Sequence, residues 1–344
     1  MNRSTARCTP IDLLKGLAII SVILLHSWDN SFLLRIGAPY YISQSVPIFI
    51  IIAAYNGVDS YFRANANTLI QCYYITHRRF NRLFLPYCIY LIIDYSIIIL
   101  MNKQVFIKNE TMFASIADKM PALIMNVLSF FVTGGYGAGS YFVPVLVQLI
   151  LTLPILYLFG SRNIKFMIIG ALIFDMIFEI YALKFGMPGW IYERIYMRYL
   201  FAAALGVWLF FGINKIWLTI GGSISIIYIT MVTYWGYIPP MQTCWGSQNA
   251  PSFMWTLAIV AIGLHVLPKN VNNSHIWFIA EIGKASYHIF LSQMVYFWVM
   301  GDSINKFSGA IVINLVICIS IGLLYYYLFN WRRLFLKFRK NVLR

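Results

Sequence analysis

The chain has 344 residues, of which 60% are hydrophobic and 11% are charged, and its formal net charge is +15. This composition excludes an ordinary soluble domain with a single core and indicates a polytopic membrane protein. The positive charge by itself also fits a nucleic-acid-binding protein, so its meaning depends on where the basic residues lie relative to the apolar segments.

Apolar windows of about twenty residues predict an all-α bundle of about ten membrane-spanning helices. The predicted spans lie near 11–28, 44–62, 84–101, 141–160, 166–183, 198–213, 216–235, 252–268, 277–299 and 309–330. Segment 121–133 is too short to cross and is expected to form an interfacial or re-entrant helix, and the longest loops are expected near 29–43, 63–83, 102–140 and 236–251. No linker or repeat interrupts the chain, so residues 1–344 are expected to form one transmembrane domain without a separate soluble domain.

The basic residues predict the orientation of the bundle. With the N-terminus inside, most of the 26 Lys and Arg residues fall on the cytoplasmic side. The positive-inside rule therefore predicts that both termini are cytoplasmic, and the charge then reflects topology and contact with membrane lipids. We expect no nucleic-acid partner. Because WDNSFLLRI follows the first apolar run where a signal peptide would have small residues, an uncleaved first span is expected.

Cysteines at positions 8, 72, 88, 244 and 318 predict neither a disulfide framework nor a metal site. In the predicted topology only Cys244 faces outside, so a pairing in an oxidising compartment has no partner. No pair of cysteines has the spacing of zinc ligands, and we expect no metal.

The first span, IDLLKGLAIISVILLHS, carries ionisable residues on one helical face: Asp12, Lys15 and His26, with Asp29 one turn beyond. Lys15 and His26 are eleven residues apart, which is roughly 16 Å along a helix. A neutral imidazole can accept a proton from a hydroxyl near pH 7, so His26 is a candidate general base that Asp29 would orient or assist at the acceptor. The alternative is structural: Asp12 pairs with Lys15, and His26 bonds to a neighbouring helix.

The segment HRRFNRLFLPY, before the third span, gathers Arg78, Arg79 and Arg82. Arg79 and Arg82 are three residues apart and would share a helix face. Guanidinium groups hold phosphoryl oxygens in pairs, so these residues are candidates for binding a phosphorylated donor on the cytoplasmic side. Ordinary positive-inside anchoring is the alternative.

Three further segments place polar residues within predicted spans. In SVPIFIIIAAYNGVDSYFR, Pro47 is expected to open or bend the helix, and Asn56, Gly57 and Asp59 mark either broken backbone or a helix end that reaches the interface. In EIGKASYHIFLSQ, Glu281 and Lys284 are expected to form a local ion pair, with His288 and Gln293 further along the span. Asp175 and Glu179 indicate a polar cavity, a proton-coupled site or packing against a basic partner.

A loop on the predicted outer side contains Glu193, Arg194 and Arg198, which are candidates for binding a charged glycan acceptor. Aromatic residues at the same height, such as Trp190 and Tyr192, could stack on sugars but are more typical of the interfacial belt. The oligomeric state stays open, and a homo-oligomer is compatible with the sequence.

Five segments, taken in chain order, resemble those of the bacterial integral-membrane acyltransferase-3 family, whose members O-acylate surface carbohydrates. They are IDLLKGLAIISVILLH, SVPIFIII, RRFNRLFLPY, YFVPVLVQLILTLPIL and IGKASYHIFLSQ, and together they run from residue 11 to about residue 300. The family usually has arginine where Lys15 stands; lysine keeps the charge without the planar fork.

The resemblance implies a multi-pass protein of the bacterial plasma membrane that moves an acyl group from cytoplasmic acyl-CoA, usually acetyl-CoA, to a hydroxyl of a surface or lipid-linked glycan. In that family pattern His26 matches the catalytic histidine, Lys15 the paired basic residue, and Arg79 with Arg82 the donor-side arginines. A glycan or lipid transporter that uses the polar stripe as a substrate path is the main alternative, but neither an inverted repeat nor paired broken helices supports it. A membrane scaffold would leave the polar stripe unexplained.

Overall fold

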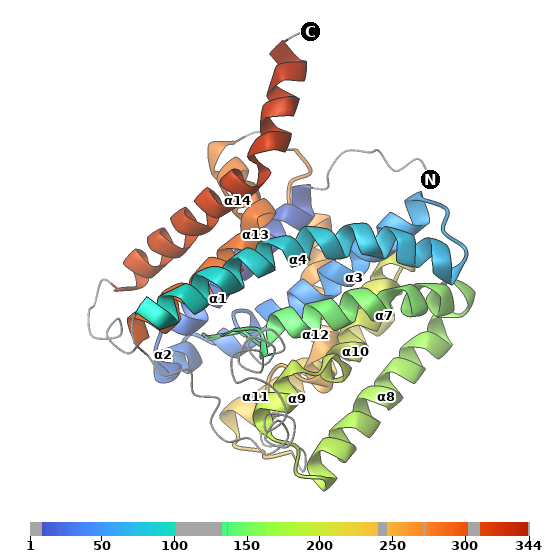
Figure 1. The fold of residues 1–344 in the computed structure, drawn as a ribbon. Coiled ribbons are helices and arrows are strands. Elements are labelled where there is room, and N and C mark those ends of the chain that lie inside the picture. The colour runs from blue at the N-terminus through green and yellow to red at the C-terminus, as the bar shows by residue number, and fades with distance from the viewer. Residues whose placement is uncertain are drawn as a thin grey trace, which may run out of the picture.

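A computed structural model describes residues 9–100, 133–135, 137–239, 246–270, 273–301 and 310–342. Over these ranges the chain folds into helices joined by short turns, and they contain no strand (Figure 1). This confirms the all-α class. Apart from Thr133, the expected interfacial helix at 121–133 lies outside the described residues.

Each apolar window contains one long helix, although α4 begins well before its window and α14 continues beyond its own. The long helices are α1 (Thr9–Ser27), α3 (Ser45–Arg63), α4 (Leu69–Leu100), α7 (Phe142–Arg162), α8 (Ile164–Lys184), α10 (Leu200–Phe211), α11 (Lys215–Tyr234), α12 (Phe253–Val266), α13 (Ser274–Met300) and α14 (Ala310–Val342). Short elements connect them: α2 (Asn30–Arg35), η1 (Ala38–Tyr40), α9 (Gly189–Arg194), η2 (Tyr196–Tyr199) and η3 (Ala250–Ser252).

Within the described chain, six helices are long and apolar enough to cross a membrane. They are α1, the unit from η1 through α3, α7, α8, α11 and α14. The apolar helices that end at Phe211 and Val266 are shorter. The count of about ten spans and the cytoplasmic position of both termini therefore stay predictions.

Helix α4 corrects one expectation. The loop expected near 63–83 is wrong over most of its length, because α4 begins at Leu69 and carries the arginine cluster in helical register. A hydropathy window finds only the apolar half of such a helix, since the other half is polar. Pro86 lies inside α4, and its carbonyl accepts a hydrogen bond of 2.6 Å from the hydroxyl of Tyr325 on α14.

Helix α3 settles the alternatives for the second span. Pro47 lies in its first turn, where a missing backbone N–H costs little, so the proline opens the helix as expected. The helix then continues through Asn56 and Gly57 to Arg63, which excludes broken backbone at this point. Asp59 pairs with Arg63 at 2.8 Å, one turn later.

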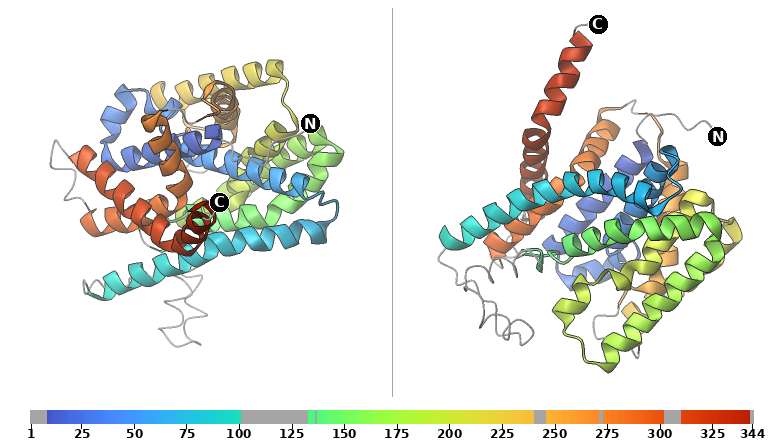
Figure 2. Two further views of the ribbon diagram at one scale, coloured as in Figure 1. Left: turned by 90° about the horizontal axis from the view of Figure 1, so that it is seen from above. Right: turned by 45° about the vertical axis from the view of Figure 1, so that its right-hand side comes forward.

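The interior of the bundle is built on α1, α3, α7, α10 and α13, whereas α8 and α11 bury few of their residues. Seen from above, α3 runs through the middle, with α4 along one edge and α11 along the opposite edge (Figure 2, left). Apolar side chains on α8, such as Phe166, Phe174 and Ile177, are exposed, as expected for a surface that contacts lipid. The C-terminal part of α14 extends beyond the other helices (Figure 1).

Glycines bring α1 and α13 into backbone contact. A Cβ added at Gly283 would collide with the carbonyl of Asp12, and one at Gly16 would collide with the carbonyl of Ile279. Small residues at a helix crossing allow this close approach, which is common where helices associate in a membrane. The crossing fixes the position of Lys15 on α1 relative to Ser286 on α13.

Candidate active site

A cavity of about 170 Å³ lies where α1, α3, α4, α7 and α13 meet. Its polar lining comes from Lys15, Asn56, Arg79, Ser286 and Tyr287, one or two from each of four helices. The remaining wall is apolar and consists of Phe49, Ala53, Leu83, Phe142, Leu146, Ile150 and Phe290. Except for Asn56, these residues belong to, or directly adjoin, the five segments on which the family resemblance rests; Asn56 lies one helical turn beyond SVPIFIII on α3.

Arg79 is the residue of the arginine cluster that points into the bundle. Its Nη2 donates to the carbonyl of Ala53 on α3 at 3.2 Å, while its buried Nη1 has no hydrogen-bond partner in the described part of the chain. The absence of a side chain at Gly57 makes room for this group, because a Cβ there would collide with Nη1 and with Leu153. A guanidinium with one edge unsatisfied beside a cavity is suited to bind an anion.

The other two arginines point elsewhere. Arg78 is exposed, donates to the hydroxyl of Tyr74 at 2.8 Å and stacks over that ring, with its Cζ 4.7 Å from the ring centroid. Arg82 is also exposed and does not line the cavity. The structure therefore divides the cluster, and only Arg79 joins Lys15.

His26 lies further along α1 and outside the lining of this cavity. It is half-buried, and its ring packs against Phe297 of α13 with 5.7 Å between centroids. Ser286, Phe290 and Phe297 recur along α13 at helical spacing, so one face of α13 runs from the cavity to His26. The position next to His26 is anchored where Asn314 of α14 donates to the hydroxyl of Ser27 at 3.1 Å.

Asp29 caps the N-terminus of α2. Its carboxylate accepts hydrogen bonds from the backbone N–H of Ser31, at 3.0 Å, and from the Ser31 hydroxyl. These bonds lower the pKa of the exposed Asp29 carboxyl below its ordinary value. The structure shows a capping role for Asp29 and no contact with His26.

A second cavity of about 280 Å³ contains the predicted outer-side residue Glu193. It is lined by Tyr141, Glu193, Arg198, Gly246, Ser247, Gln248 and Asn249. Arg194 turns away from it: Nε donates to the carbonyl of Thr133 at 2.8 Å, and Nη1 donates to the carbonyl of Trp190 at 2.7 Å. Arg194 thus joins loop segments, and its neighbour Arg198 supplies the cation of the cavity.

Comparison with known families decides the identity. A family model described as an acyltransferase domain matches residues 10–337, which is nearly the whole chain. The chain belongs to the acyltransferase-3 family. No curated protein and no solved structure matches it. The protein is therefore a multi-pass membrane acyltransferase.

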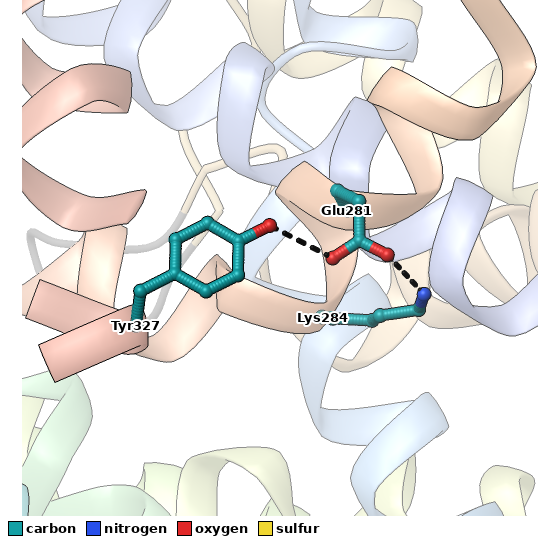
Figure 3. Close-up of polar contacts among 3 residues, drawn as sticks. All are labelled: Glu281, Lys284 and Tyr327. Carbon is teal, nitrogen blue, oxygen red and sulfur yellow. Dashed lines mark hydrogen bonds and ion pairs between the residues drawn. The ribbon is translucent and has the colours of Figure 1, made fainter. Parts of the chain in front are cut away.

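In this acyltransferase, Glu281 and Lys284 form the local ion pair that the sequence predicts (Figure 3). The second carboxylate oxygen of Glu281 accepts a 3.3 Å hydrogen bond from Tyr327 of α14. Further along α13, His288 packs its ring against those of Tyr325 and Tyr326, with centroids 5.0 and 5.4 Å away. Both groups join α13 to α14 and lie outside the cavity that Lys15 and Arg79 line.

Glu179 and Asp175, the buried carboxylates of α8, form hydrogen bonds with residues near the second cavity. Burial raises the pKa of the Tyr192 phenol, which therefore stays protonated and donates to both oxygens of Glu179, at 2.7 and 2.9 Å. Asp175 accepts a 3.3 Å hydrogen bond from the backbone N–H of Phe201. Arg198 lies nearby, so the alternative of packing close to a basic residue describes Asp175 and Glu179 best.

Sequence reasoning about this acyltransferase does not single out three polar residues of the cavity that Lys15 and Arg79 line. Asn56 enters only as an interruption of an apolar helix, and Ser286 and Tyr287 enter only as part of a motif. The usable signal is a polar side chain on an otherwise apolar helix, and for Ser286 and Tyr287 it lies within a family segment.

Proposed function

We propose that this acyltransferase moves an acetyl group from acetyl-CoA to a hydroxyl of a cell-surface or lipid-linked glycan in the bacterial plasma membrane. The observation that supports the proposal most is the convergence of five segments, distant in sequence, on one cavity that carries Lys15 and Arg79. Family membership supplies the reaction class.

The donor would bind through its phosphates to Lys15 and Arg79. Two cations at one cavity, one with an unpartnered N–H, match the negative charge of a phosphoryl group. Asn56 and Ser286 add neutral polar groups, while Phe142 and Phe290 supply an apolar wall. A cavity of this size holds only part of a coenzyme A thioester, so the pantetheine arm and its acetyl group would continue along α13 towards His26.

His26 would act as the general base. In the proposed step its neutral imidazole takes the proton of the acceptor hydroxyl while the hydroxyl oxygen forms a bond with the thioester carbonyl carbon. The carbon–sulfur bond then breaks, and the departing thiolate takes the proton back from the imidazolium. The spacing of roughly 16 Å between Lys15 and His26 fits an extended pantetheine arm, which would bring the thioester to the acceptor hydroxyl at His26.

Glu193 is the proposed contact to the acceptor, since it lines the second cavity. Asp29 would stabilise the turn that follows His26 by capping α2. Arg194 would act indirectly, because its guanidinium holds the carbonyls of Thr133 and Trp190. A transporter function is not favoured, because the family is defined by an acyltransferase domain.

Transfer of labelled acetyl from acetyl-CoA to endogenous glycan tests the proposal in membranes that carry wild type, His26→Ala or His265→Ala. His265 is exposed near the end of α12 and serves as the matched control. Expression and membrane insertion are compared for all three. We expect labelled glycan with wild type and the control and a loss of at least about a hundredfold with His26→Ala.

Two other outcomes would contradict parts of the proposal. Equal labelling with His26→Ala would exclude His26 as the base. No labelled glycan with wild type would exclude acetyl-CoA as the donor or glycan as the acceptor in those membranes. Acetyl found on His26 after a brief reaction without acceptor would replace direct transfer by an acyl-histidine intermediate.

A further inference from the structure

The second cavity has a fixed wall. Gln44, which is fully buried, donates from Nε2 to the carbonyls of Pro39 at 2.8 Å and Ser247 at 2.9 Å, and its Oε1 accepts from Thr256 at 2.6 Å. Asn249 accepts from the backbone N–H of Gly246 at 3.0 Å and donates to the Tyr192 hydroxyl at 3.0 Å. The loop that lines the cavity is therefore held in place before any ligand arrives.

Arg198 is a buried cation without a hydrogen bond in the described chain. Its exposed fraction is 5%, and its Nε is buried without a partner. The rings of Tyr192 and Tyr199 lie 4.7 and 4.9 Å from its Cζ, so aromatic contacts surround the group. Within the described chain Arg198 forms no ion pair with Glu193 or Asp175, although both lie in the same region, and Glu179 lies close enough for its charge to act on Arg198.

An anion bound beside Arg198 would stabilise its buried guanidinium. The ring faces of Tyr192 and Tyr199 stabilise the cation but do not provide it with a charge-assisted hydrogen bond. A buried guanidinium with an unsatisfied donor, here Nε, is costly, and a carboxylate or phosphate that fills the cavity beside it would provide charge-assisted hydrogen bonds.

Glu193 adds a second requirement. Its carboxylate lines the same cavity and accepts only hydrogen-bond donors, such as hydroxyls. A ligand that suits both residues therefore carries a negative group for Arg198 and hydroxyls for Glu193. At about 280 Å³ the cavity is close to the lower end of the roughly 300–1,000 Å³ of small-ligand sites.

We propose that this cavity binds the anionic group of an acidic saccharide, with Arg198 holding its carboxylate or phosphate and Glu193 accepting hydrogen bonds from its hydroxyls. The inference rests on the proposed function for its choice of a saccharide, and it narrows the acceptor to glycans that contain an acidic sugar.

Ligand binding to the purified full-length protein, without any acyl donor, tests this inference separately from acetyl transfer. Saturation-transfer NMR compares methyl glucuronide, glucose 1-phosphate, the neutral methyl glucoside and glycerol 3-phosphate at up to about 50 mM. We expect at least one of the two sugar anions to bind about tenfold or more tightly than methyl glucoside and glycerol 3-phosphate. Which one binds tells whether the anion is a carboxylate or a phosphate.

Variants locate the binding. In Arg198→Gln, the affinity for the sugar anion is expected to fall to the affinity for methyl glucoside. In Glu193→Gln, the affinities for the sugar anion and for methyl glucoside are expected to fall alike. Arg35→Gln, an exposed arginine at the end of α2, is the matched control and should bind as wild type does. If Arg198→Gln fails to fold, the comparison of ligands on wild type still decides.

Three results would overturn the inference: no preference of wild type for either sugar anion over the neutral sugar, unchanged binding in a folded Arg198→Gln variant, or equal binding of glycerol 3-phosphate, which would indicate a lipid headgroup. Acetyl transfer that fails while the sugar anion binds through Arg198 would reject the proposed reaction and leave this site standing.

Discussion

Replacing Gly57 by alanine should disturb the donor site without changing any charge. The added Cβ would collide with Nη1 of Arg79 and with Leu153, both of which are ends of side chains that can move. Alanine favours a helix by up to about 1 kcal/mol over glycine, so α3 should persist while the guanidinium is displaced. A hydrogen bond to a charged group contributes about 1.5–3 kcal/mol, which corresponds to a rise of about ten- to a hundredfold in KM for acetyl-CoA.

Initial rates with varied acetyl-CoA measure this effect in membranes that contain equal amounts of protein. Gly170→Ala on α8 is the matched control, because a Cβ at Gly170 meets no atom within 4 Å. We expect KM to rise for Gly57→Ala and to stay at the wild-type value for Gly170→Ala. An unchanged KM for Gly57→Ala, with normal expression, would refute the assignment of Arg79 to the donor.

Three further predictions follow from the same contacts. Gly283→Ala forces α1 and α13 apart at the carbonyl of Asp12, and overpacking of this kind costs about 1–3 kcal/mol of stability. The variant should therefore unfold at a lower temperature than wild type in detergent. An unchanged unfolding temperature would contradict the close crossing. Glu281→Gln should leave the rate of transfer within about twofold of wild type, because Glu281 pairs locally with Lys284; a loss of more than tenfold would place it in the reaction. Folding lowers the pKa of Asp29, so its cap on α2 is fully present above the ordinary carboxyl pKa and is lost as the pH falls through the lower pKa of the folded state. In that pH range, hydrogen exchange at the Ser31 amide should become faster than in a reference peptide at the same pH. The Asp29→Asn variant should show no such increase in exchange rate.

The sequence predicted the helices and the chemical groups of the proposed donor site better than the orientation of those groups. Lys15 and Arg79 were both expected at the donor, and the structure places them in one cavity. Arg79 and Arg82 looked equivalent, since residues three apart share a helix face. What separates them is the carbonyl of Ala53 and the space at Gly57, both on another helix, and periodicity within one segment cannot reveal such partners.

The residues predicted on the outer side show the same limit of sequence reasoning. Glu193, Arg194 and Arg198 follow one another in a short stretch, and composition does not tell which of them faces a cavity. Arg194 is held by the carbonyl of Thr133, which is 61 residues away, and that contact leaves the cavity to Arg198. Contacts between residues so far apart in sequence arise only from the tertiary fold. Apolar periodicity predicts the individual helices but not how they pack.

Equilibrium binding of labelled acetyl-CoA to the purified protein tests most directly whether the cavity between α1, α3, α4, α7 and α13 is the donor site. The comparison uses wild type, Arg79→Gln and Arg78→Gln, which differ by one position on the same helix. We predict saturable binding by wild type, at least about tenfold weaker binding by Arg79→Gln, and a change of less than about threefold for the exposed Arg78→Gln. Equal losses in both variants, or binding that neither variant weakens, would contradict the assignment of this cavity to the acyl donor.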